Sequence, residues 1–212
     1  MKLHRHEILL RRSKPEDSAM VGALIYSTGP HFFDHVFGKG RIKICRLLEC
    51  LYRKRTGIFS FHFSTVAVCQ GRVVGLVLVY DKWQRRLHSL LNNFYVLTRY
   101  SPVKIIWMLY RDFHVKRFIK RIPRRSLYVA HLAVIPQFQG QGIGQSLLKI
   151  AIEAAKISGY ANCSLDVLVT NTAALRLYEK MGFTIVNEIR HKNLEEKYKL
   201  KGQFRMIKQL LV

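Results

Sequence analysis

The sequence predicts an α/β fold in which a central mixed β-sheet of about seven strands is flanked by helices. Two apolar runs meet at the turn Gln70-Gly71-Arg72, a pattern that indicates a β-hairpin. After Arg125, strand-like and helix-like segments follow in the order β-α-β-α, which is typical of a sheet with helices on its faces. No internal repeat or low-complexity linker divides the chain, so we expect a single domain over residues 1–212.

The first eighty or so residues are expected to supply three strands and two helices. Pro15 and Glu16 favour a helix start, and Ser27-Thr28-Gly29-Pro30 breaks that helix. After the Gly38-Lys39-Gly40 turn, apolar residues recur at helical spacing and predict a second helix. In chain order, the elements are a strand over 7–12, a helix from Pro15 or Glu16 to about Tyr26, a helix over 41–55, and strands over 59–68 and 73–80.

Residues 82–125 are predicted to form a helical insertion ahead of the central strand. The segment is rich in Arg, Lys and aromatic residues, and helical stripes surround the break at Pro102. One interpretation is an amphipathic lid or a flap over the core. The other is a surface for a membrane or a nucleic acid, since basic amphipathic helices bind both. The residues concerned are Ile105, Met108, Leu109, Asp112 and Lys116 in the stripe, and the pairs Lys116-Arg117, Lys120-Arg121 and Arg124-Arg125.

The second half of the chain is more regular, and its boundaries follow from periodicity. Its helix after the central strand has an apolar stripe at helical spacing, from Ile143 to Ala154. The predicted elements are a strand over 127–134, a helix over 142–158, a strand over 163–169, a helix over 171–181, and strands over 183–189 and 204–211.

The chain is strongly basic. Its 36 Lys and Arg residues against 13 Asp and Glu give a net charge of +23 and a pI near 10.3. Such a surface favours anionic partners such as a phosphate-bearing cofactor, a nucleic acid or an anionic membrane. A general solubility bias explains the charge equally well.

The cysteines and the N-terminus suggest an ordinary cytoplasmic protein. The four cysteines lack a paired metal-ligand spacing, so we expect small buried thiols and predict no metal site. No apolar run of signal-peptide length follows Met1. The most apolar patch, residues 105–110, is too short to span a bilayer, so no transmembrane segment is predicted.

A glycine-rich loop lies between the predicted central strand and the helix after it. Glycines beside a helix start let an anion approach unpaired N–H groups closely. A dinucleotide fingerprint is not matched, because the third glycine, Gly144, falls one place early when counted from Gly140. A Walker loop is excluded, because Gln145-Ser146 stands where Lys-Ser or Lys-Thr is needed. A tight turn without a ligand is the structural alternative.

The Q-x-x-G-x-G pattern of Gln139, Gly142 and Gly144 resembles the pyrophosphate-binding signature of the GNAT superfamily of acetyl-CoA-dependent N-acetyltransferases. Upstream, Leu132-Ala133-Val134-Ile135-Pro136 looks like the central strand of that family. Downstream, Asn171-x-x-Ala174-x-x-x-Tyr178-x-x-x-Gly182-Phe183 is similar to its later helix and strand. The resemblance implies a GNAT-like acyl-CoA N-acyltransferase fold with a cofactor-binding core over about 126–190, and acetyl transfer to a primary amine by direct attack.

The resemblance also implies which residues bind acetyl-CoA. Asn171 is expected to contact the pantetheine or phosphate region, and the Tyr178 hydroxyl to lie near the sulfur. In the family, two strands splay apart at the central strand and free its backbone groups, here at residues 132–134. The alternatives are a helix N-cap for Asn171 and a buried core aromatic for Tyr178. The full set is Leu132, Ala133, Val134, Gln139, Gly140, Gln141, Gly142, Ile143, Gly144, Gln145, Asn171 and Tyr178.

Two residues are candidates for proton transfer. Tyr178 is predicted to donate a hydrogen bond or a proton as charge gathers on the sulfur, because a phenol of pKa about 10 is close to a thiol of about 8.5. His131 is the candidate base, with Tyr128 or water as alternatives. Strict alternation places His131 on the face opposite Leu132 and Val134, with Tyr128 and Ala130 on their face, unless a bulge changes the phase.

The acceptor is not identified by any pattern. The segments 31–37 and 83–125 match no recognised specificity signal. The positive charge favours acidic or phosphate-linked amines over free polyamines. A homodimer is left open. The alternative function is a basic nucleic-acid- or ribosome-associated binding protein on the same scaffold without turnover.

Overall fold

The computed structural model describes residues 7–97, 101–103, 105–107, 121–189 and 202–210. Seven strands form one sheet in the order β1-β2-β3-β4-β5-β7-β6. β4 and β5 are parallel neighbours, and the other neighbouring pairs are antiparallel. This mixed sheet confirms the predicted fold class. The strands are β1 Ile8–Arg12, β2 Ser64–Cys69, β3 Arg72–Tyr80, β4 Ser126–Val134, β5 Asn162–Leu168, β6 Thr184–Ile189 and β7 Gln203–Gln209.

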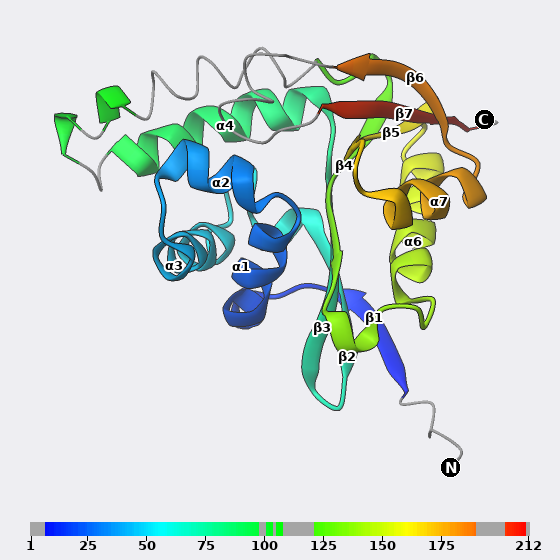
Figure 1. The fold of residues 1–212 in the computed structure, drawn as a ribbon, viewed down its shortest axis with the longest axis horizontal. Helices are drawn as coiled ribbons and strands as arrows, with labels where there is room; N and C mark the ends of the chain where they lie inside the picture. Colours follow the sequence, from blue (N-terminus) through cyan, green and yellow to red (C-terminus); the bar gives the residue numbers. More distant parts are fainter. Residues whose placement is uncertain (1–6, 98–100, 104, 108–120, 190–201, 211–212) are drawn as a thin grey trace.

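Helices cover both faces of the sheet (Figure 1). One face is covered by α1 to α3, whose apolar residues form a core cluster with Leu76 and Leu78 of β3. The other is covered by α6 and α7, which enclose a second cluster around Leu147 and Leu165. The described helices are α1 Ser18–Ser27, α2 Pro30–Phe37, α3 Arg41–Tyr52, α4 Lys82–Leu97, α6 Ile143–Ile157 and α7 Thr172–Lys180.

The main differences from the sequence prediction lie in the first half of the chain, where a 3-10 helix, Pro15–Asp17, precedes α1. Residues 30–37 form α2, where no element was expected, because Pro30 occupies the first turn of a helix, a position that tolerates proline. β2 begins at Ser64 rather than 59, because Ser60 caps a short 3-10 helix by accepting a hydrogen bond from the His62 N–H. α3 ends at Tyr52 instead of 55.

The predicted insertion is helical over most of its described residues, but residues 121–125 at its end form no helix. α4 fills its first part, and residues 102–103 and 105–107 after it are also helical. The stripe residues Met108, Leu109, Asp112 and Lys116, and the basic residues 116, 117 and 120, lie outside the described residues.

Candidate active site

The sheet opens between two neighbouring strands. The parallel pairing of β4 with β5 runs from Ser126 to Val129 and then ends. Beyond that point β4 continues to Val134, still paired with β3, and β5 continues to Leu168, paired with β7. The strands therefore diverge on one side of β4, as the family resemblance implies.

Two N–H groups of β4 face this gap. In an antiparallel pair, backbone polar groups point alternately toward the partner strand and away from it. The Ile135 N–H donates to the Val74 carbonyl at 2.9 Å. By alternation, the N–H groups of Leu132 and Val134 point away from β3, into the space between β4 and β5. They are donors for oxygen atoms of a ligand.

Helix α6 begins beside the gap with an uncapped N-terminus. Its N-cap residue, Gly142, has φ 82° and no side chain to bond the first-turn amides. The N–H groups of Ile143, Gly144 and Gln145 therefore lack intrahelical acceptors. Gly140 also has positive φ, at 76°, and a Cβ at Gly140 or Gly142 would meet nothing within 4 Å. The two glycines are needed for the backbone conformation, and they leave open space in which an anion can approach.

The glutamines of this loop have different surroundings. Gln139 Nε2 donates to the Val134 carbonyl at 2.8 Å and ties the loop to the end of β4. Gln141 Nε2 donates to the Gln137 carbonyl at 3.2 Å. Gln145 lies in the first turn of α6 and lines the adjacent cavity, whereas Gln141 does not. The side chain of Gln139 thus positions the loop.

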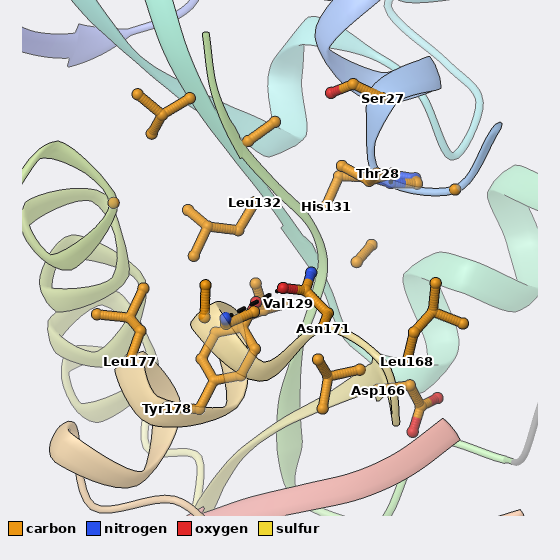
Figure 2. Close-up of a pocket in the computed structure, with 18 of the residues that line it drawn as sticks. Ser27, Thr28, Val129, His131, Leu132, Asp166, Leu168, Asn171, Leu177 and Tyr178 are labelled. Carbon is orange, nitrogen blue, oxygen red and sulfur yellow. Dashed lines mark hydrogen bonds between the residues drawn. The ribbon is translucent and has the colours of Figure 1, made fainter. Parts of the chain in front are cut away.

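Helix α7 contributes Asn171 and Tyr178 to the same cavity (Figure 2). Asn171 Oδ1 accepts a hydrogen bond from the Ala174 N–H at 3.1 Å, so Asn171 is the N-cap of α7. Its Nδ2 amide remains the group with which it could bind a ligand. The Tyr178 ring is 7% exposed and packs against Phe183, with 6.0 Å between ring centroids.

The Tyr178 hydroxyl keeps its proton at neutral pH. Burial raises the pKa of Tyr178 to about 12. The hydroxyl has no hydrogen-bond partner among the described residues. It is therefore a protonated donor without an acceptor among those residues, on a ring whose position is fixed by packing.

A β-bulge at Ala130 interrupts the alternation of side chains between the two faces of β4. The register of β4 against β3 shifts by one residue there. Tyr128 and Ala130 consequently pack with the α1–α3 cluster, whereas Leu132 and Val134 pack with the α6–α7 cluster. The expectation that Tyr128 and Ala130 share a face with Leu132 is wrong, and the bulge is the reason. His131 does lie on the side opposite Leu132, as predicted (Figure 2).

His131 is held by Thr28 and by two phenylalanine rings. Its Nδ1 lies 2.8 Å from Thr28 Oγ1, which itself donates to the Ile25 carbonyl at 2.7 Å. With the hydroxyl proton used in that bond, we assign the proton of the neutral imidazole to Nδ1 and the lone pair to Nε2. The ring stacks on Phe33 and Phe59, with centroids 6.0 and 5.8 Å away. Burial lowers the pKa of His131 to about 4, so the ring is neutral at pH 7.

A buried ion pair lies on the same side of β4. Arg205 Nε and Nη2 donate to the two carboxylate oxygens of Asp166, the second at 2.8 Å. The Tyr128 hydroxyl donates to Asp166 Oδ2 at 3.0 Å. Burial, with the charge of Asp166, raises the pKa of Tyr128 well above its usual value. Tyr128 thus stays protonated, and Arg205 compensates the charge of Asp166.

No local pattern in the sequence links this pair, because Asp166 lies on β5 and Arg205 on β7. The available signal was a carboxylate between apolar residues of a predicted strand, Leu165-Asp166-Val167, which requires a buried partner.

One cavity of about 810 Å³ joins these parts. Every residue predicted to bind the cofactor lines it except Gln141. The end of the cavity opposite these residues is lined mostly by aromatic side chains. Asp166 is the one residue with a carboxylate among all the lining residues. That end includes Thr28, Phe32, Phe33, Phe59, Tyr80, Arg85, Tyr128 and His131.

The cysteines differ in their exposure. Cys69 and Cys163 are buried thiols as expected, but Cys50 is exposed. Among the described residues, no group of three or more His, Cys, Asp or Glu side chains could hold a metal ion. Within the same part of the chain, no helix combines the length and apolar character needed to cross a membrane.

Comparisons with curated proteins point to one family. The family model described as Acetyltransferase (GNAT) family matches residues 47–183. An uncharacterized N-acetyltransferase of Methanocaldococcus jannaschii is 36% identical over 94 residues, which are 44% of this chain and 37% of the relative. An N-alpha-acetyltransferase of Sulfurisphaera tokodaii is 34% identical over 76 residues, 34% of this chain and 46% of the relative. The chain spans less than half the length of these relatives.

Solved structures agree in fold. One acetyltransferase superposes with a TM-score of 0.71 at 21% identity, covering 96% of this chain and 100% of that chain. An N-acetyltransferase from Staphylococcus aureus superposes with a TM-score of 0.66 at 17% identity, covering 94% and 98%. At such identities the likeness shows the fold alone, but the family model matches more than half of the sequence. The chain therefore belongs to the GNAT family of acetyltransferases.

Proposed function

We propose that this protein transfers an acetyl group from acetyl-CoA to a primary amine by direct attack of the amine. The observation that carries this proposal is the single cavity that joins the uncapped N-terminus of α6, the gap between β4 and β5, and an aromatic end. Family membership supports the reaction class. A structural neighbour with a TM-score of 0.55, the NatC complex, was solved with CoA and a peptide bound.

The residues present fit acetyl-CoA at two places. First-turn N–H groups and the dipole of α6 suit a diphosphate, since no protein side chain caps them. The N–H groups of Leu132 and Val134 suit oxygen atoms of the pantetheine arm or of the acetyl carbonyl. Asn171 would add its side-chain amide. When bound, acetyl-CoA supplies an acetyl group activated as a thioester.

In this proposal Tyr178 stabilises the departing sulfur. With its pKa raised to about 12, full proton transfer to a thiolate of ordinary pKa about 8.5 is uphill. A hydrogen bond that strengthens as negative charge develops on sulfur is therefore the larger contribution. The N–H groups that face the gap would stabilise the charge that develops on the carbonyl oxygen.

We assign His131 the role of a proton relay. Its Nε2 has the free lone pair, but a pKa near 4 makes it a weak base that passes a proton on to water rather than storing it. Thr28 fixes the ring orientation through the 2.8 Å hydrogen bond.

The acceptor end of the cavity favours amines with a neutral or apolar body. Its lining is mostly aromatic, and Arg205 already compensates the charge of Asp166. The lining residues therefore include no uncompensated carboxylate that could attract a second positive charge on the amine substrate. The lack of such a carboxylate agrees with the expectation from the net charge that free polyamines are poor acceptors.

The test incubates the purified protein with acetyl-CoA and a panel of aromatic, aliphatic, acidic and polycationic amines, and follows free thiol. Mass spectrometry of the acetylated amine separates transfer from thioester hydrolysis, for which a blank without amine is the control. If calorimetry shows CoA binding but no amine raises thiol release above the blank, the protein is a scaffold without turnover. If CoA does not bind, the cofactor assignment is wrong as well.

A further inference from the structure

Helix α4 carries a row of exposed apolar side chains that no described residue covers. They lie at separations of four, seven, eight and eleven residues from the first, which places them on one face of a helix. Their exposed fractions are high: Trp83 68%, Leu87 59%, Leu90 64%, Leu91 41% and Phe94 69%. Single exposed apolar residues are common on soluble proteins, but a continuous face of this kind marks an interaction site.

The opposite face of α4 fixes its orientation on the protein. His88 Nδ1 accepts a hydrogen bond from the Gly57 N–H at 2.9 Å, and its ring meets Phe63 edge-on at 4.8 Å. Asn92, one turn later, is 7% exposed. Arg85, one turn earlier, lines the cavity. The apolar row therefore points outward because the other side of the helix is packed.

A second set of exposed apolar side chains follows α4 in the sequence. Val103 and Ile106 are each 67% exposed, and Trp107 is 58% exposed. The described parts of this segment lie beyond the far end of α4 (Figure 1). The chain has two tryptophans, and both belong to these groups. We call the eight residues Trp83, Leu87, Leu90, Leu91, Phe94, Val103, Ile106 and Trp107 the apolar surface.

The same stretch of sequence is strongly basic. Residues 82–125 contain twelve Lys or Arg and one acidic residue, Asp112. Near the N-terminus of α4, Lys82 Nζ lies 5.8 Å from the centre of the Trp83 ring, so charge and apolar surface adjoin. Helices that lie in a membrane interface have this composition: exposed Trp, Phe and Leu beside Lys and Arg on one amphipathic helix.

We propose that the apolar surface docks on an anionic lipid bilayer. Charge complementarity selects this occupant: positive side chains meet anionic headgroups while the apolar row enters the acyl boundary. A second copy of the chain would bring a net charge of +23 against another +23. A nucleic acid would satisfy the charge but offers nothing for Leu87, Leu90 and Leu91 to bury in.

Docking of this kind would bring the acceptor end of the cavity to the lipid surface. Arg85, on the packed side of α4, lines that end of the cavity, within one turn of Trp83 and Leu87. Amines presented at a membrane surface would then be concentrated where the proposed acetyl transfer takes place. This consequence rests on the proposed function, whereas the docking itself does not.

The test measures flotation of the 212-residue protein with vesicles of phosphatidylcholine alone and with phosphatidylcholine containing about a third phosphatidylglycerol. Binding to the anionic vesicles is expected to shift tryptophan emission to shorter wavelength, because both reporters enter the interface. The double variant Leu90→Gln/Phe94→Gln should lose about tenfold or more of the partition coefficient. The matched control is Ile157→Gln, at a site 86% exposed on α6, which should bind like the original chain.

Four results would overturn the proposal. They are no flotation with anionic vesicles, binding without a shift in tryptophan emission, equal loss in the Ile157→Gln control, and a dimer in vesicle-free sedimentation that the double variant dissociates. An RNA of equal phosphate concentration serves as a further arm. If RNA binding also depends on Leu90 and Phe94, the surface recognises nucleic acid instead. CoA affinity of the double variant should be unchanged, which separates this test from that of the proposed function.

Discussion

Removing the hydroxyl of Tyr178 tests the central chemical assignment. Tyr178→Phe keeps the ring, which is 7% exposed and packed against Phe183. Because the hydroxyl has no partner among the described residues, the free energy of unfolding should change by less than about 0.5 kcal/mol. The variant should therefore fold normally and retain the proposed cofactor site.

Turnover should fall far more than stability. A donor that acts on developing charge in a closed site contributes about 3 kcal/mol, which corresponds to a roughly hundredfold loss in kcat. Tyr160→Phe is the crossed control, because the Tyr160 hydroxyl donates to Asp81 Oδ2 at 2.7 Å and neither residue lines the cavity. That variant should lose about 2 kcal/mol of stability and keep its kcat.

The measurements are thiol release under saturating acetyl-CoA, calorimetry with CoA, and urea unfolding of each variant. Unchanged kcat in Tyr178→Phe would refute the assignment of this hydroxyl. A fall in kcat matched by an equal loss in CoA affinity would show that Tyr178 binds the cofactor without a specific role at the sulfur.

Three further predictions follow from the geometry. Gly142→Ala should lower the free energy of unfolding in urea by about 1 kcal/mol because of the positive φ at this position, and should weaken CoA binding tenfold or more in calorimetry. The control is Gly71→Ala, at a glycine with φ 76° and equally open space around it. The control should lose the same stability and keep its CoA affinity. Burial lowers the pKa of His131 from 6.5 to about 4. As the pH falls, His131 is therefore protonated in the unfolded chain at a higher pH than in the folded protein. Stability should then fall by up to about 3 kcal/mol as pH drops through that window, and His131→Asn should remove this part of the unfolding profile. Asp166→Asn removes the carboxylate that pairs with the buried Arg205 guanidinium and should cost about 3 kcal/mol by urea midpoint. Glu153→Gln, in an exposed pair with Lys156, should change stability by less than about 0.5 kcal/mol.

The second half of the fold could be predicted closely because its signals are local. The helix expected over 142–158 is α6, Ile143–Ile157, and the strand expected over 163–169 is β5, Asn162–Leu168. Periodicity sets the length of each element, and glycines mark where α6 begins. The predicted cofactor residues come from similarly local motifs, and all of them but Gln141 line one cavity.

The remaining features depend on contacts between distant segments. The bulge at Ala130 exists only in the pairing of β4 with β3, so alternation along β4 alone assigned Tyr128 to the wrong face. The partner of Asp166 is Arg205, thirty-nine residues later on β7. Composition and helical stripes predicted a helical insertion over 82–125, but they could not tell which side of α4 packs against the rest of the protein.

The diverging strands have a consequence for the protein without ligand. Where β5 leaves β4, the amides of Leu132 and Val134 lose a neighbouring strand and must bond to water. In the proposed binding mode the extended pantetheine arm takes the place of that missing strand. Cofactor binding would then complete the sheet, and hydrogen–deuterium exchange at these two amides should slow when CoA is added while that of Ala133, which faces β3, changes little.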